Sequence, residues 1–299
     1  MRFTVVRKPN TNRSMTLVYV ERLGEGSDCW LEVPVLCESE DSYGNGLWSQ
    51  LFDEETLRKL TERLPERIAF LGAHTYKSGE LEDANLFDSK RKIVAIGLNY
   101  RDHADEFGDE YPTEPLIFCK ASSAINHSGG DIVLPETSSR VDYEGELVAV
   151  IGKTCRNVSV ESALDYVFGY CCGNDVSARD WQKGKPGGQW FLGKSFDSFA
   201  PIGPMIVTAD EVGDPNSLKI ETRLNGVTVQ SSHTSRMIFK VSEIISYVSG
   251  VMTLQPGDLV FTGTPNGVGD ARRPPLYLHS GDIVEVEIEK LGVLRSRVK

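Results

Sequence analysis

The run VDYEGELVAVIG, residues 141–152, constrains the chain most, because it places carboxylates on an otherwise apolar strand. Alternate side chains of a strand point to the same face, so Glu144 and Glu146 project together, and Asp142 is expected to share their face. Carboxylates on a buried strand repel each other unless a cation lies between them. Oxygen ligands favour Mg²⁺, Mn²⁺ or Ca²⁺ over zinc. An exposed acidic strand face is the alternative, and the spacing alone leaves both open.

A third carboxylate favours the metal interpretation. Asp175 directly follows the apolar run GYCCGN, which reads as a buried strand, and it opens the polar stretch VSARDWQKGK. The end of a strand is a natural place for a metal ligand, whereas a turn or cap is the alternative role for a lone aspartate. We therefore expect a metal site formed by Glu144, Glu146 and Asp175.

Two further segments carry candidate catalytic residues. In NYRDHADEFG, His103 and Glu106 are three residues apart and share a face if the stretch is helical, so that Glu106 could orient the imidazole. A solvated histidine beside a charge is the alternative. Lys194 lies in FLGKSFDSF between apolar neighbours, where an ammonium group needs an anionic partner. A surface lysine that extends into solvent is the alternative.

The segment TGTPNGVG, residues 262–269, is rich in glycine. Its glycines allow backbone N–H groups to approach a ligand closely, and Thr264 offers a hydroxyl. The spacing does not match the phosphate-binding GxxxxGK[ST] pattern, so nucleotide binding is not indicated. A tight turn between strands is the alternative interpretation.

The pattern of short strands predicts a mainly β (α+β) fold, built as a roll or barrel. Asn225-Gly226 between two β-type runs predicts a hairpin, VSEIISYVSGVM predicts an amphipathic helix, and GDIVEVEIEKLG predicts a strand with one wet face. A helix is also expected from Asp53. A polar connector separates a small N-terminal α+β domain, residues 1–88, from a catalytic domain, residues 89–299.

Composition excludes several classes of function. The chain has 299 residues and a net charge of -11, which argues against binding nucleic acid or anionic membranes. It shows neither a signal peptide nor a run of about 18 apolar residues, so we expect a cytoplasmic protein. A mitochondrial leader is the alternative, which the early Glu21 and Glu25 disfavour. No CxxC pair occurs among six cysteines, and no G-x-S-x-G elbow is present, which argues against a zinc site of that kind and a serine hydrolase.

Taken in order, the motifs resemble the fumarylacetoacetate hydrolase superfamily over about residues 92–298. They are GLNYRDHADE, KASSAI, VDYEGELVAVIGK, GYCCGNDVSARDWQ, GKSFDSFAPIGP and VMTLQPGDLVFTGTPNGVG. The resemblance implies a mixed β-roll, a variable N-terminal domain and a homodimer. It also implies Mg²⁺ or Mn²⁺, or Ca²⁺, at Glu144, Glu146 and Asp175. It further implies a dyad of His103 and Glu106 on a lid over the substrate. The active-site lysine would be Lys194, and Gln182 and Thr264 would contact the substrate.

Arg179 belongs to the A-R-D triplet of the same motif and is counted with the substrate-binding candidates, although a supporting role behind the site is also expected for it. The stretch KGKPGGQW lacks the tyrosine of fumarylacetoacetate hydrolase itself, so the chain resembles the shorter members more closely.

Those shorter members act on 2-oxo acids or 1,3-dicarbonyl compounds through a metal-bound enolate. The implied reaction is C–C bond hydrolysis of an acylpyruvate or decarboxylation of oxaloacetate. The alternatives are an isomerase or tautomerase for the same substrates, or a non-catalytic binding protein on the same fold. The expected partner is a small-molecule 2-oxo acid or diketone.

Overall fold

A large mixed sheet dominates the computed structural model, which describes residues 2–7, 14–20, 29–32, 75–77, 82–83, 91–108 and 110–299. Ten of its twelve strands lie side by side in the order β4 (Thr75–Lys77), β3 (Cys29–Glu32), β2 (Ser14–Val20), β1 (Arg2–Arg7), β14 (Ala200–Thr208), β12 (Val167–Asn174), β11 (Gly145–Ile151), β17 (Leu259–Phe261), β6 (Ile93–Gly97) and β7 (Leu116–Lys120). The other two are β5 (Glu82–Asp83), paired with β1, and β8 (Ile125–His127), paired with β14.

Two smaller sheets complete the β structure of the described residues. One has five strands in the order β16 (Val227–His233), β15 (Lys219–Leu224), β18 (Ile283–Ile288), β19 (Gly292–Val298) and β9 (Asp131–Ile132). The other pairs β10 (Val141–Asp142) with β13 (Ser177–Ala178). The predicted mainly β fold is confirmed.

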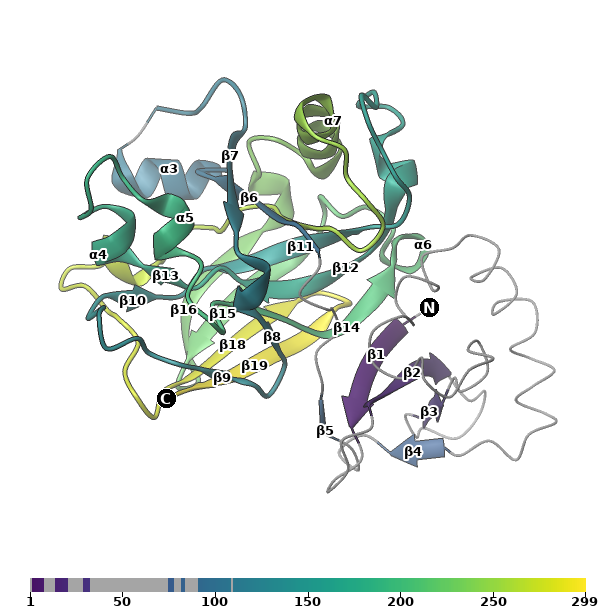
Figure 1. Cartoon of the computed structure of the whole chain (residues 1–299), viewed down its shortest axis with the longest axis horizontal. Coiled ribbons are helices and arrows are strands. Elements are labelled where there is room, and N and C mark those ends of the chain that lie inside the picture. Colours follow the sequence, from purple (N-terminus) through teal and green to yellow (C-terminus); the bar gives the residue numbers. More distant parts are fainter. Residues whose placement is uncertain are drawn as a thin grey trace, which may run out of the picture.

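Helices are few and short in the described part of the chain. They are α3 (Arg101–Phe107), α4 (Arg179–Gln182), α5 (Trp190–Gly193), α6 (Ala209–Val212) and α7 (Val241–Val251), with 3₁₀ turns at η3 (Ser122–Ala124), η4 (Ala163–Tyr166), η5 (Thr234–Arg236) and η6 (Gly269–Ala271). Figure 1 shows α3, α4 and α5 grouped at one end of the molecule, with the purple strands β1–β3 at the other. None of these helices is long and apolar enough to cross a membrane.

The strand β11 separates two apolar clusters. Val148 and Val150 face one cluster, whereas Leu147, Ala149 and Ile151 face the other, where α7 packs. Glu146 is two residues before Val148 on this strand, so its carboxylate is on the face of the first cluster, and it lines one pocket with residues of α3, α4 and α5.

Several local predictions are confirmed. Asn225 and Gly226 both have positive φ angles, 53° and 78°, and join β15 to β16, as a type I′ hairpin requires. Helix α7 covers the predicted amphipathic segment, and Val284, Val286 and Ile288 are the buried face of β18. The predicted helix from Asp53 and the domain boundary near residue 88 lie outside the described residues, so the division into residues 1–88 and 89–299 stays a prediction.

The close pairing of β12 with β14 predicts that Gly169→Ala destabilises the protein. A Cβ at Gly169 would lie 2.3 Å from the carbonyl oxygen of Val207, so the ladder must shift, at a cost of about 1–3 kcal/mol in the free energy of unfolding. The control is Gly250→Ala in α7, where nothing lies within 4 Å of the added Cβ and where alanine should stabilise by about 0.5–1 kcal/mol. Urea unfolding followed by circular dichroism measures both. Equal stability of the two variants would contradict the packing described here.

Candidate active site

Three buried carboxylates meet at the end of the β11–β12 pair. Glu146 lies opposite Gly173 in the antiparallel register, which brings Asp175, one residue beyond β12, beside Glu144. The Asp175 N–H donates to the Glu144 carbonyl at 2.8 Å. Ligand oxygens of the three side chains lie within 4.8 Å of one another, and the residues are 5%, 1% and 0% exposed. The structure therefore brings together the three residues that the sequence indicated.

Asp142 does not join this group, although we expected it on the same strand face. The chain leaves the ladder at residues 143–144, so Asp142 belongs to the separate strand β10. Its carboxylate accepts hydrogen bonds from the backbone N–H groups of Gly269 and Asp270, at 2.7 and 3.0 Å, and pairs with Arg179 at 2.8 Å. Asp142 thus anchors a loop and an arginine beside the carboxylates.

Three buried cations surround the carboxylates. Lys194 Nζ lies 2.7 Å from Glu144 Oε2 and 2.5 Å from Asp175 Oδ2. Arg179 Nη2 lies 2.6 Å from Glu144 Oε1, and Lys120 Nζ lies 2.5 Å from Asp175 Oδ1. The surface alternative for Lys194 is wrong, because the residue is 2% exposed while Phe191 and Leu192 beside it face solvent.

The charges of this cluster do not balance. The four carboxylates Asp142, Glu144, Glu146 and Asp175 face the three cations Lys120, Arg179 and Lys194, which leaves one negative charge in excess. Glu146 carries that excess, since it has no ion-pair partner among the described residues and accepts the N–H of Gly263 at 2.7 Å.

The pKa values reflect the same imbalance. Burial, together with the charges of Asp175 and Glu144, raises the pKa of Glu146 well above its ordinary value. Burial also opposes ionisation of Glu144, but Lys194 and Arg179 outweigh it and hold the pKa of that carboxyl below its ordinary range. For Lys120, burial lowers the pKa despite the opposing effect of Asp175.

This donor set fits a hard divalent cation. All three groups offer carboxylate oxygens, they converge within one coordination sphere, and the group with unbalanced charge is one of them. A cation held there would be bound by Glu144, Glu146 and Asp175, with Lys194 and Lys120 holding the carboxylates that they already contact.

A pocket of about 140 Å³ opens onto the carboxylates. Glu144, Glu146 and Lys194 form its polar floor, and it is lined further by Ile96, Gly97, Leu98, His103, Phe118, Arg179, Gln182, Lys183, Trp190 and Thr264. Asp175 is not among the lining residues, so it lies behind the floor. The pocket therefore gathers most of the residues that the sequence singled out.

The predicted dyad lies on α3 at the wall of this pocket. His103 Nδ1 is 3.3 Å from Glu106 Oε2, and His103 is 7% exposed, so the alternative of a solvated loop histidine is wrong. Gly108 ends the helix in the left-handed conformation, with a φ of 71°. Glu106 also accepts the backbone N–H of Gly267 at 3.0 Å, which ties the dyad to the glycine-rich loop.

That loop serves the site through its backbone. The Gly263 N–H binds Glu146 and the Gly267 N–H binds Glu106, and both glycines have a φ of 98°, where a side chain is strained. The Thr264 hydroxyl donates to the Gly145 carbonyl at 2.9 Å and accepts from Gln230 at 2.9 Å. The N–H groups of this loop thus bind the side chains of Glu146 and Glu106, whereas the sequence had indicated that they approach a ligand.

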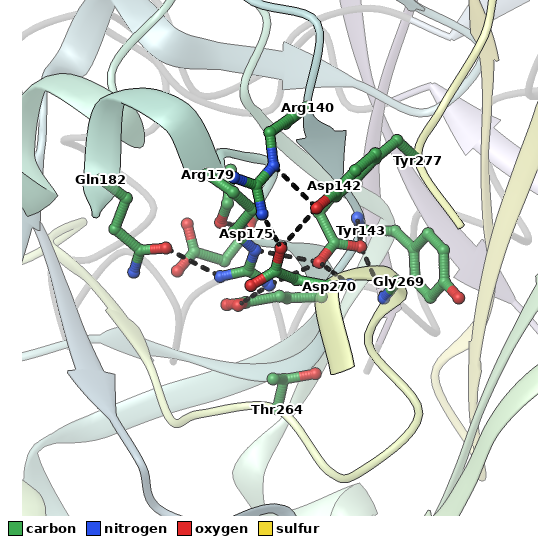
Figure 2. A network of polar contacts seen from close by, with 12 residues as sticks. Arg140, Asp142, Tyr143, Asp175, Arg179, Gln182, Thr264, Gly269, Asp270 and Tyr277 are labelled. Atoms are coloured by element: carbon green, nitrogen blue, oxygen red, sulfur yellow. Dashed lines mark hydrogen bonds and ion pairs between the residues drawn. The ribbon is translucent and has the colours of Figure 1, made fainter. Parts of the chain in front are cut away.

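Arg179 is the centre of a polar network beside the pocket (Figure 2). Its Nη1 donates to Gln182 Oε1 at 2.9 Å, while Nε and Nη2 donate to Asp142 Oδ2 at 2.9 and 2.8 Å. Because its guanidinium is occupied by protein partners, Arg179 fits the supporting role better than direct substrate binding. Gln182 lines the pocket and is oriented by Arg179.

Sequence reasoning missed the role of Lys120. Its signal is the run LIFCK, where a lysine ends an apolar strand, much as Asp175 follows one. The partner lies 55 residues away, so the pairing has no local signature.

Comparisons with known proteins find a family match and several relatives. The family described as "Fumarylacetoacetate (FAA) hydrolase C-terminal" matches residues 92–299. The chain is 50% identical over 207 residues to the mitochondrial oxaloacetate tautomerase FAHD2A of Bos taurus, covering 69% of this chain and 66% of that protein. It is 52% identical over 208 residues to a 2,4-didehydro-3-deoxy-L-rhamnonate hydrolase of a Sphingomonas species, covering 69% and 73%.

Among solved structures, the fumarylpyruvate hydrolase of Pseudomonas aeruginosa, in complex with Mn²⁺ and pyruvate, superposes with a TM-score of 0.63. The two chains are 37% identical, and the match covers 70% of this chain and 89% of the other. The alignments with the curated relatives above span about two thirds to three quarters of those proteins. The chain belongs to the fumarylacetoacetate hydrolase family.

Proposed function

We propose that this protein is a divalent-metal-dependent enzyme that interconverts the enol and keto forms of a small 2-oxo acid, with oxaloacetate as the first candidate. The observation that carries the proposal is the meeting of three elements in one pocket: the carboxylates Glu144 and Glu146, the lysine Lys194 and the histidine His103. The 50% identity to an oxaloacetate tautomerase supports the choice of substrate.

The size of the pocket supports a small substrate. A cavity of about 150 Å³ holds a benzene-sized molecule, and the volume here is about 140 Å³. A four-carbon 2-oxo acid is of comparable size, and one end of it can extend into the opening of the pocket. The related Pseudomonas structure holds Mn²⁺ and pyruvate, which supports the choice of a divalent metal and a 2-oxo acid for this protein.

The reaction needs a group that moves one proton. A Mg²⁺ or Mn²⁺ ion at the three carboxylates would supply Lewis acidity toward the oxygens of the 2-oxo acid. His103 would deliver a proton to the substrate carbon beside the keto group and recover one from the enol oxygen. Since Nδ1 contacts Glu106, Nε2 would be the nitrogen that exchanges the proton. Lys194 would offset negative charge that develops near the floor of the pocket.

Hydrolysis of a C–C bond in an acylpyruvate is the second candidate. The observation that favours it is the 52% identity to a 2,4-didehydro-3-deoxy-L-rhamnonate hydrolase. The same dyad would remove a proton from water for attack on the distal carbonyl. Decarboxylation of oxaloacetate would use the same residues to stabilise the pyruvate enolate that remains when CO₂ leaves, and His103 would then protonate it. A homodimer and a cytoplasmic location stay predictions that accompany this proposal.

Product analysis separates the candidates. Purified protein is given oxaloacetate or acetylpyruvate with Mg²⁺, with Mn²⁺ or with EDTA, while enol absorbance, CO₂ and pyruvate are followed. Accelerated loss of the oxaloacetate enol without CO₂ supports the tautomerase. Pyruvate with acetate from acetylpyruvate supports the hydrolase, and pyruvate with CO₂ supports the decarboxylase. Activity that survives EDTA in full would contradict the metal requirement.

The metal site predicts that Glu146→Gln binds Mn²⁺ at least about 100-fold more weakly than the wild type, because a ligand is lost. Asp175→Asn should behave in the same way. The control is Glu287→Gln, which changes another E-x-E glutamate on the wet face of β18, with a side chain that is 49% exposed. Isothermal titration calorimetry with Mn²⁺ measures the affinities. Equal binding by Glu146→Gln and Glu287→Gln would refute the assignment.

The dyad predicts that His103→Ala keeps Mn²⁺ affinity but lowers kcat by about 10²–10⁴-fold, because proton transfer is lost. Glu106→Gln should lower kcat less, since the imidazole remains. The control is His279→Ala, a histidine far along the chain that lines no part of the pocket. Steady-state kinetics and calorimetry give the two quantities. An unchanged kcat in His103→Ala would exclude this histidine from the chemistry.

A further inference from the structure

We propose that Lys183 binds the distal carboxylate of the substrate and thereby selects dicarboxylic 2-oxo acids over those with a neutral far end. This inference rests on the proposed function, because it assumes that the 2-oxo end of the substrate lies at the carboxylate floor. It adds the class of substrate and the residue that recognises it.

The cations of the pocket differ in availability. Arg179, Lys183 and Lys194 are the lysine and arginine side chains that line it. Arg179 and Lys194 are 4% and 2% exposed and are engaged by the buried carboxylates. The side chain of Lys183, in contrast, is 50% exposed. It follows Gln182 at the C-terminal end of α4, and both residues line the pocket.

Asp270, which Lys183 contacts, has other hydrogen-bond donors as well. Lys183 Nζ lies 2.8 Å from Asp270 Oδ2. Asp270 also accepts hydrogen bonds from Arg140 Nη2 at 2.8 Å and from the Tyr277 hydroxyl at 2.5 Å (Figure 2). When Lys183 turns toward a ligand, Asp270 keeps these two donors. The energy lost with this half-exposed ion pair is small.

Part of the pocket wall offers no charged partner to a carboxylate. Ile96, Phe118 and Trp190 supply apolar surface to that part of the lining. A neutral acyl group could rest on that wall, whereas a second carboxylate needs a cation. The chain carries a net charge of -11, so local positive charge is required to hold a dianion. Of the described lining residues, Lys183 is placed to supply it.

Kinetics with two substrates test the assignment. Lys183→Gln keeps a polar, unbranched side chain and removes its charge. We expect kcat/KM for oxaloacetate to fall about tenfold, mainly through KM, because one charged hydrogen bond is lost. Turnover of acetylpyruvate, which ends in a neutral acetyl group, should change less than about twofold on the same reasoning. Lys183→Arg should recover most of the oxaloacetate activity.

The matched control is Lys185→Gln. Lys185 is two residues further on and exposed, and it lies over the Trp181 ring, outside the pocket lining. It should leave both substrates unaffected. An equal loss on both substrates in Lys183→Gln, or no loss on either, would overturn the inference.

Failure of the proposed function gives a different result. If the wild-type protein with Mn²⁺ turns over neither substrate, the proposed reaction is wrong, and Lys183 is then tested by binding alone. Thermal shift measured with oxaloacetate and with pyruvate serves this purpose, since pyruvate lacks the distal carboxylate. Lys183→Gln should reduce the shift caused by oxaloacetate and spare the one caused by pyruvate. Equal shifts in variant and wild type would overturn the inference independently.

Discussion

The mutual repulsion of Glu144, Glu146 and Asp175 is the constraint on which the site depends. Burying three carboxylates within one coordination sphere is costly unless positive charge is brought to them. Lys194 and Lys120 approach from two different segments and supply part of it. Glu146 is left without an ion-pair partner among the described residues, and a divalent cation would stabilise its ionised form. The fold thus retains unfavourable repulsion between carboxylates at the place where its chemistry is proposed.

One loop connects the two halves of the proposed chemistry. The backbone of Gly263 holds Glu146, and the backbone of Gly267 holds Glu106. The same loop continues to Gly269 and Asp270, whose N–H groups bind Asp142 and so position Arg179. Because N–H groups of this one loop bind the carboxylates of Glu146, Glu106 and Asp142, changes in the loop should affect metal binding and the dyad together.

Local patterns predicted the parts of the site that depend on local geometry. Strand alternation predicted that Glu144 and Glu146 lie together, and they do, although Glu144 precedes the first residue of β11. Helical spacing predicted that His103 lies near Glu106. The role of Asp142 could not be predicted in this way, because a break in the ladder moves it to another strand. The contact of Asp142 with Arg179 and that of Lys120 with Asp175 join residues 37 and 55 positions apart in the sequence, which no local pattern can predict. The family resemblance supplied what spacing alone left open.

The account is tested most directly by a crystal structure grown with Mn²⁺ and analysed by anomalous scattering. We predict one strong anomalous peak with oxygens of Glu144, Glu146 and Asp175 within about 2.0–2.6 Å, and with Lys194 still in contact with its carboxylates. A strong peak only at another site, or no peak between these three carboxylates in crystals grown with Mn²⁺, would contradict the central claim.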